Sequence, residues 1–330
     1  DGAPDNIEID AGTDPKDAGD SPNTIILIRD TTSGESWETP AVWSSGAAAE
    51  AGKSYVISAG AGSVLKSPKG QAAFPAGAIL TLGSATAELE LISRNPAHFD
   101  DLRLQAGSVT SAGSRTGLAG NATIGGDVTI ALNGGQSFEL SSNLSGEGNL
   151  TFSQTEGLKA TATLSGIGTN FSGEVLANGV IVEFAGLSPI GNANFAFFNG
   201  GMRLITNVLM PENVLGVGGV DFLIDLNGGK AVFKAMNGID ADGNILFAID
   251  PGIYDRDALL GLGFNEDTVV DSEGSIVVLG DEGDSDKDGL WDQWETDTFG
   301  DLTQTADGDG DGDGLSNADE FRIGSDPAKA

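Results

Sequence analysis

Cysteine is absent from this chain of 330 residues, which excludes a disulfide framework and thiolate chemistry. Basic side chains are scarce: 16 Lys and Arg stand against 49 Asp and Glu, for a formal net charge of −33. Such a chain repels nucleic acid and anionic membranes and attracts divalent cations. No run of about 18 apolar residues occurs, so we expect no membrane-spanning helix.

The acidic residues concentrate at the two ends of the chain. Residues 1–20 hold 7 acids and one base, and residues 281–330 hold 16 acids and three bases. The 260 residues between them carry a net charge of only −14. We therefore expect an acidic flexible N-terminal segment at 1–23, a large domain at 24–280 and a small acidic module at 281–330.

Two twelve-residue loops lie in the acidic C-terminal part, starting at Asp284 and Asp309. Each carries oxygen-bearing side chains at loop positions 1, 3, 5, 9 and 12, a glycine at 6 and a carbonyl at 7. Ca²⁺ requires such hard oxygen donors, a sharp turn at 6 and a bidentate Glu at 12. The predicted ligands are Asp284, Asp286, Asp288, Leu290, Asp292 and Glu295 in the first loop, and Asp309, Asp311, Asp313, Leu315, Asn317 and Glu320 in the second.

An acidic tail produces single matches to this pattern by chance, but two matches offset by 25 residues are hard to explain that way. We therefore predict an EF-hand-like module that binds at least two Ca²⁺ ions, with a short helix leaving each loop at positions 9–12. Its apolar core is small, so the ions are expected to supply its order. Asp240–Asn244 is a weaker candidate for a further loop, because position 12 lacks an acid.

Short apolar runs separated by Gly, Asn and Ser recur between residues 40 and 280. Runs such as Ile79–Leu82, Val128–Ala131 and Ile245–Ala248 show the alternation of strands that are buried on one side. The recurrence continues without a shift in composition and uses few aromatics per strand. It predicts an all-β fold, a parallel β-helix or solenoid with about 20–25 residues per rung. A β-sandwich or jelly-roll pair is the alternative.

The segment Leu164–Gly173 reads Leu-Ser-Gly-Ile-Gly-Thr-Asn-Phe-Ser-Gly and is followed by the strand-like Val180–Phe184. With Gly146–Phe152 and Trp37–Ile57, it resembles the autotransporter-associated β-strand repeat over roughly residues 35–210. That resemblance implies a secreted or surface-displayed right-handed β-helix that serves as a stalk, adhesin or exposed passenger.

The tandem loops and the ending Gly324-Ser-Asp-Pro327 resemble the bacterial thrombospondin type 3-like calcium repeat, over about residues 284–327. A dockerin shares the duplicated loop–helix plan and would imply a cohesin partner, but this ending and the Trp-rich first loop favour the thrombospondin-like interpretation. Gly12-Thr-Asp-Pro15 is of the same type. The run Thr24–Ile28 behind it is expected to form the first strand or, alternatively, to dock on a neighbouring subunit.

The calcium loops and the solenoid indicate a structural protein of the cell surface or extracellular matrix: an adhesin, a stalk or a self-assembling filament subunit. Calcium loops of this type fill outside the cell, and the start at Asp1 rather than Met suggests a removed signal peptide. The expected partners are further copies of the chain, in a head-to-tail oligomer or filament, or surface glycans.

A carbohydrate-binding or polysaccharide-degrading β-helix enzyme is the alternative. Such enzymes use paired carboxylates, or calcium with a basic residue, on one face. The candidates are weak, because the single histidine, His98, is expected in a surface loop and the acidic pairs Asp100-Asp101 and Asp221/Asp225 are common on solvated faces. No nucleophile elbow, phosphate loop or metalloprotease helix is present. We therefore predict no catalytic residues.

Overall fold

The computed structural model describes residues 24–330, except 60–61, 71, 155–157, 167, 169, 187–190, 220–221, 242, 263, 265–268, 271–272, 281–284, 287, 289, 291, 324–326 and 330. The acidic segment 1–23, including Gly12–Pro15, lies outside the described residues. Within the described part, no helix is both long and apolar enough to cross a bilayer.

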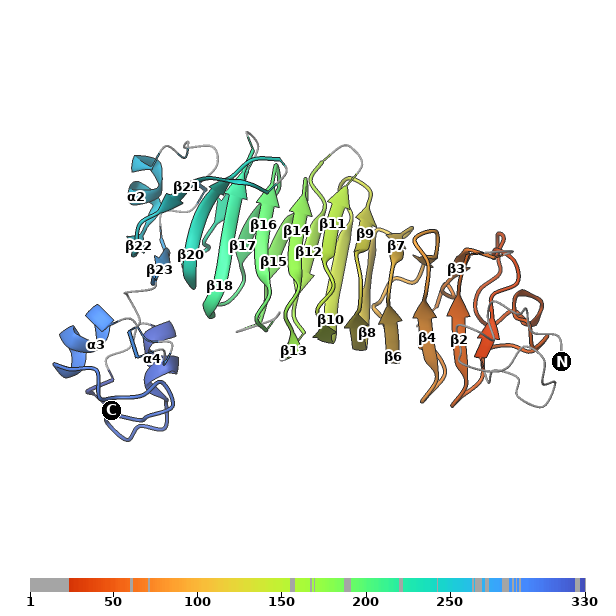
Figure 1. The fold of residues 1–330 in the computed structure, drawn as a ribbon, viewed down its shortest axis with the longest axis horizontal. Helices are drawn as coiled ribbons and strands as arrows, with labels where there is room; N and C mark the ends of the chain where they lie inside the picture. The colour runs from red at the N-terminus through yellow and green to blue at the C-terminus, as the bar shows by residue number, and fades with distance from the viewer. Residues whose placement is uncertain are drawn as a thin grey trace.

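The chain winds into a parallel β-solenoid, as predicted, and its strands fall into two long sheets (Figure 1). The first sheet stacks β1 (Thr24–Ile26), β2 (Ser54–Ile57), β4 (Ile79–Leu82), β6 (Ala97–Leu104), β8 (Arg115–Ile124), β10 (Ser137–Gly146), β12 (Thr161–Leu164), β15 (Ile181–Phe184), β17 (Gly201–Leu204) and β19 (Leu223–Asp225), with β13 (Asn170–Phe171) beside β10. The second sheet stacks β3 (Val64–Lys66), β5 (Glu88–Leu91), β7 (Gly107–Ser111), β9 (Val128–Leu132), β11 (Leu150–Gln154), β14 (Glu174–Asn178), β16 (Asn194–Phe198), β18 (Val208–Gly218), β20 (Lys230–Ile239) and β23 (Ser275–Val278).

The period of the solenoid agrees with the sequence pattern. Thr161 pairs with Ile181, 20 residues later, and Ser54 pairs with Ile79, 25 residues later. Between β2 and β20, each turn adds one strand to each sheet, so a strand bonds to the equivalent strand of the next turn rather than to its neighbour along the chain. This parallel pairing excludes the jelly-roll alternative, whose strands are antiparallel.

The core runs along the axis between the two sheets. Strands such as β4 and β15 alternate half-buried and buried residues, so one face of each sheet is inside and the other is outside. At the N-terminal end, Trp37 meets the rings of Phe74 and Phe99 edge-on, and η1 (Pro40–Val42) leads to the buried Trp43. These large side chains fill the first turns.

Glycines stand at corners where successive turns approach closely. A Cβ added at Gly173, within the segment that resembles the autotransporter-associated repeat, would lie 1.9 Å from the carbonyl oxygen of Gly148 on the turn before. No side chain fits there, which explains why the segment ends in Ser-Gly.

After β20 the regular parallel stacking of strands is interrupted, although the sequence predicts one more rung there. Ile245–Ala248 does belong to a strand, β21 (Ile245–Ile249), but that strand folds back antiparallel on β20. The short β22 (Gly252–Tyr254) is antiparallel to β23, and α2 (Arg256–Gly261) follows it. The offset between paired residues therefore grows to 45 between Lys230 and Ser275. The prediction of a further parallel rung at 245–248 was wrong, because a run this short carries no information about strand direction.

Two short helices form most of the regular structure beyond the solenoid. They are α3 (Asp292–Phe299) and α4 (Asn317–Ile323), and they lie beside the end of the solenoid opposite the N-terminus (Figure 1). Each begins at position 9 of a predicted calcium loop, as expected.

Candidate calcium sites

The second loop gathers carboxylates from its first half. Ligand oxygens of Asp309, Asp311 and Asp313, at positions 1, 3 and 5, lie within 4.8 Å of one another. Backbone N–H groups of Gly312 and Gly314 donate to Asp309 at 2.7 and 3.1 Å, which bends the loop around these side chains. Gly314, at position 6, has φ +96°, the left-handed conformation that a sharp turn needs.

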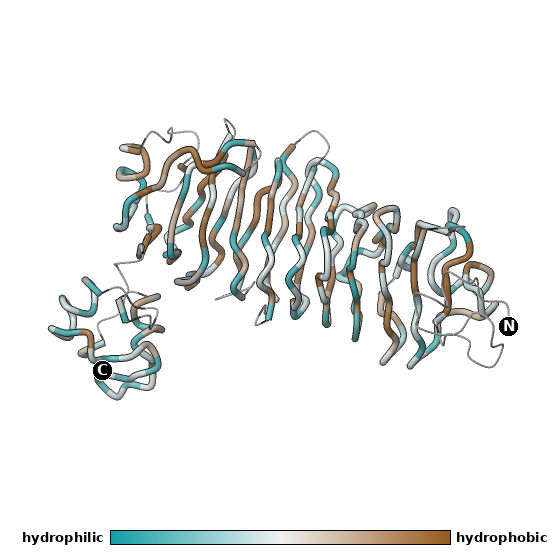
Figure 2. The backbone as a smooth tube through the Cα atoms, in the orientation of Figure 1, coloured by the Kyte–Doolittle hydropathy of each residue, from teal (hydrophilic) through white to brown (hydrophobic). Residues whose placement is uncertain are grey.

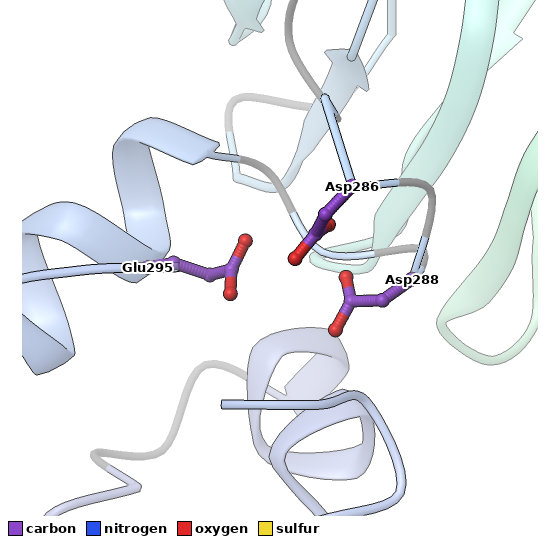
Figure 3. A group of neighbouring side chains, drawn as sticks. All are labelled: Asp286, Asp288 and Glu295. Carbon is purple, nitrogen blue, oxygen red and sulfur yellow. The ribbon is translucent and has the colours of Figure 1, made fainter. Parts of the chain in front are cut away.

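The first loop gathers a complementary set. Asp286, Asp288 and Glu295, at positions 3, 5 and 12, also have ligand oxygens within 4.8 Å of one another. Figure 3 shows the Glu295 carboxylate extending from α3 toward the two loop aspartates. Asp284, Gly289 and the neighbouring Trp291 lie outside the described residues. Of the predicted carboxylate ligands, Asp292 is not part of this group of three, and Glu320 is not part of the second group.

Two hydrogen bonds recur at equivalent positions of both loops. The N–H at position 2 donates to the side-chain oxygen at position 9, from Ser285 to Asp292 at 2.8 Å and from Gly310 to Asn317 at 3.2 Å. The N–H at position 7 donates to the carboxylate at position 5 at 2.8 Å in each loop, from Leu290 to Asp288 and from Leu315 to Asp313. The loops therefore share these local hydrogen bonds at equivalent positions.

The start of α4 is capped by a side chain. Ser316 Oγ accepts from the N–H of Asp319 at 3.1 Å, which is the N-cap bond of the helix, and it donates to the Asp319 carboxylate at 3.0 Å. This cap begins the helix one residue later, at Asn317, and so directs Glu320 back toward the loop from the first turn.

Several carboxylates of the two loops are buried or lie close to other carboxylates, where a negative charge is unfavourable without a cation. Glu295 and Glu320 are fully buried, and Asp311 Oδ2 is buried without a hydrogen bond to any described residue. Burial, together with the charges of Asp286 and Asp292, raises the pKa of Asp288, although the N–H groups of Leu290 and Ala306 oppose the change. A divalent cation would satisfy the buried oxygens and offset this mutual repulsion.

These donors fit Ca²⁺. They are hard oxygens from carboxylates and an amide, arranged in loops with a tight turn, and they offer no soft ligand that would favour a thiophilic metal. Asp286, Asp288 and Glu295 would hold one ion, and Asp309, Asp311 and Asp313 another. A bound ion would offset the excess negative charge of this segment.

The loops pack against the solenoid, which sequence analysis missed. Leu290 and Phe321 are buried against Val232 on β20 and against Val277 and Leu279 on and after β23. Trp294 joins them, with its ring 4.8 Å from that of Phe321 and 5.6 Å from that of Phe299. The apolar core of the module is therefore shared with the last strands of the second sheet.

A lysine of the solenoid reinforces this contact. Lys230 Nζ, on β20, donates to the carbonyl oxygen of Phe321 at 3.0 Å and lies 5.2 Å from the centre of its ring. Burial lowers the pKa of Lys230. The ammonium group satisfies a carbonyl near the end of α4, where a positive charge is favourable.

The sequence did carry a signal for this docking. Ile276, Val277, Val278 and Leu279 form a continuous apolar run, and Ala231, Val232 and Phe233 form another. Each of these residues is buried. Continuous runs indicate strands that are covered on both faces, and here the calcium loops cover the outer face.

The other candidate residues have structural roles. His98 lies in strand β6, not in a loop as expected, and its Nε2 is 3.1 Å from Asp100 Oδ1. Asp101 pairs with Arg103 at 2.8 Å. Asp240 accepts from the backbone and side chain of Asn244 and so closes the hairpin between β20 and β21. Asp221 and Asp242 lie outside the described residues.

Comparison with known families supports the interpretation of the second loop. The family model of the bacterial TSP3 repeat matches residues 309–330 and also residues 1–18, where Gly12-Thr-Asp-Pro15 stands. TSP3 repeats are extracellular and bind calcium. No curated protein and no solved structure matches the chain significantly. The chain is therefore a β-solenoid that carries TSP3-like sequence at both ends.

Proposed function

We propose that this protein is a secreted structural component of the cell surface or extracellular matrix, whose C-terminal loops bind at least two Ca²⁺ ions. The support comes from two loops with equivalent internal hydrogen bonds and convergent carboxylates. The TSP3 match to the second loop points to the same chemistry. We infer no catalytic role, and kinship with autotransporter passengers remains part of the proposal.

The structure suggests a purpose for the ions. Buried glutamates and clustered aspartates repel one another, so the packed form of the loops is favoured when cations neutralise them. Calcium would therefore hold the module on the last turns of the solenoid. Such a device suits a protein that works where calcium is abundant and that must stay folded without disulfides.

Calcium titration calorimetry on the chelator-treated full chain tests this proposal. We expect at least two binding events, and we expect Glu295→Gln and Glu320→Gln each to weaken one of them by roughly tenfold or more, because each removes a charged ligand. Asp297→Asn is the matched control, since it removes an exposed charge from α3. The absence of heat from the wild-type chain would refute the proposal.

We also propose head-to-tail self-association. At the end of the solenoid away from the N-terminus, β21 and β22 each pair with a single described strand, β20 and β23 respectively, so each has an open edge. At this end, Ile245, Leu246, Phe247 and Ile253 are half or more exposed, and Figure 2 shows the brown, apolar stretch along β21. An open edge with apolar side chains favours addition of a further strand.

Light scattering and electron microscopy at increasing protein concentration test this association. We expect end-to-end particles from the wild-type chain, and we expect Phe247→Ser to shift them toward monomers. Leu158→Ser, at an 83% exposed residue on the side of the rod, is the control. A wild-type chain that remains monomeric at all concentrations would rule the filament out.

A further inference from the structure

The outer face of the first sheet carries a row of polar residues that was not predicted from the sequence. The parallel register places Glu139, Thr163, Glu183, Arg203 and Asp225 side by side on five successive strands, from β10 to β19. Neighbouring strands lie about 4.8 Å apart, so this row repeats a hydrogen-bonding group at that interval.

One end of the row borders a hollow of about 390 Å³ between strands β8 and β15. It is lined by Arg115, Ser137, Glu139, Thr163, Ser165 and Glu183. Gly117 on β8 stands beside Glu139, and a Cβ there would come 2.1 Å from the carbonyl oxygen of Glu139. A side chain is thereby excluded from this position, and Ala185 adds only a methyl group at the other border.

The two carboxylates of the hollow differ in their partners. Glu183 accepts from Thr163 and from Arg203, each at 2.8 Å, and Arg203 also bonds to Asp225. Its charge is therefore balanced within the row. Glu139 has only the guanidinium of Arg115 nearby, at 3.8 Å. Within the described part of the chain, the side chains of Glu139, Ser137 and Ser165 make no hydrogen bond.

This chemistry selects among ligands. An anion would be repelled by Glu139 and by the strongly acidic chain. A metal ion would find a single free carboxylate, Glu139, with the positively charged guanidinium of Arg115 beside it, so it would bind poorly. Phe138 and Ala185 also line the hollow, so it offers some apolar surface beside its polar groups. A neutral, hydroxyl-rich ligand does fit, because a carboxylate accepts from two hydroxyls while serine hydroxyls both donate and accept.

We propose that the hollow on strands β8 to β15 is a binding subsite for a neutral saccharide of one or two pyranose units, with Glu139 as its main acceptor. Its volume lies in the range of small-molecule sites. The polar row continuing to Asp225 would let a longer chain extend across the strands. The subsite is far from the calcium loops in sequence and does not depend on them.

Saturation-transfer NMR and calorimetry on the calcium-loaded full chain test this subsite. The probes are cellotetraose, xylotetraose and maltotetraose, with tetragalacturonic acid as the anionic comparison. We expect at least one neutral probe to bind and the anionic one to bind more weakly. Glu139→Ala should weaken binding roughly tenfold to a hundredfold, since it removes charged hydrogen bonds.

Further variants separate this site from any other. Ser165→Trp fills the hollow and should abolish binding, whereas Glu174→Ala removes an exposed carboxylate from β14 on the second sheet and should change nothing. Thermal melts of all variants check the fold. The proposal is overturned if no neutral probe binds at up to about 10 mM, if Glu139→Ala and Ser165→Trp bind like the wild type, or if the anionic probe binds as well as the neutral ones.

Discussion

Position 7 of each calcium loop offers a matched pair of substitutions that isolates the docking of the module. Leu290 in the first loop is 0% exposed and packs against Val232 and Val277 of the solenoid, whereas Leu315 in the second loop is 37% exposed. Both leucines follow the turn glycine, and both donate their N–H to the carboxylate at position 5. Alanine leaves these backbone roles intact and removes only the side chain.

The expected cost follows from burial. Truncation of a fully buried leucine to alanine destabilises a protein by about 2–5 kcal/mol. The contact lies at the edge of the solenoid and can partly relax, so we expect about 2 kcal/mol for Leu290→Ala. For Leu315→Ala the change should stay within about 0.5 kcal/mol. If the ions bind the docked module best, 2 kcal/mol corresponds to a roughly thirtyfold loss of apparent calcium affinity.

Calcium titration of both variants, followed by calorimetry and by tryptophan fluorescence, measures this difference. The fluorescence reports on docking because Trp294 packs on Phe321 at the interface. Limited proteolysis at low calcium gives a second readout, since an undocked module is cleaved faster. Equal calcium affinity and equal protease resistance for Leu290→Ala and Leu315→Ala would show that the solenoid does not support the loops.

Two further substitutions test the contact and the solenoid itself. Lys230→Met removes the donor to the carbonyl oxygen of Phe321 and should destabilise the docked module by about 1–3 kcal/mol, because that carbonyl loses its partner; fluorescence-monitored urea melts at fixed calcium measure it, and an unchanged transition would contradict the role of Lys230. Gly173→Ala places a methyl group against Gly148 and should cost about 1–3 kcal/mol in the main unfolding transition. Gly70→Ala, at a position with nothing within 4 Å, is its control, and equal melting temperatures for the two would refute the close-approach argument.

The strands of the solenoid could be predicted because each rung repeats the same requirement. A strand with one face inside and one face outside must alternate, and Ile79–Leu82 does so in sequence and in burial. The rung length was predictable for the same reason, since the apolar runs recur at the interval that the pairing later shows. The clustering of carboxylates in the two acidic loops was predictable because their spacing is local: residues within twelve positions of one another can meet whatever the rest of the chain does.

Contacts between segments that are distant in the sequence could not be predicted from local spacing. The apolar run Ile245–Ala248 is compatible with a parallel rung, yet β21 turns back along β20, because the hydrogen bonds between Asp240 and Asn244 close a hairpin. Strand direction depends on the connection, and a run of four residues does not encode it. The hollow beside Glu139 arises likewise from residues 20 or more positions apart, which only the register brings together.

By itself, the order of residues determined the repeating strand and the two acidic loops, since both depend on short spacings along the chain. Tertiary structure alone decided that the loops rest on Val232 and Val277 and that Lys230 holds Phe321, 91 positions away. The reason is that burial of apolar surface is non-directional: it requires that these side chains be covered, and only the folded path of the chain selects which segment covers them.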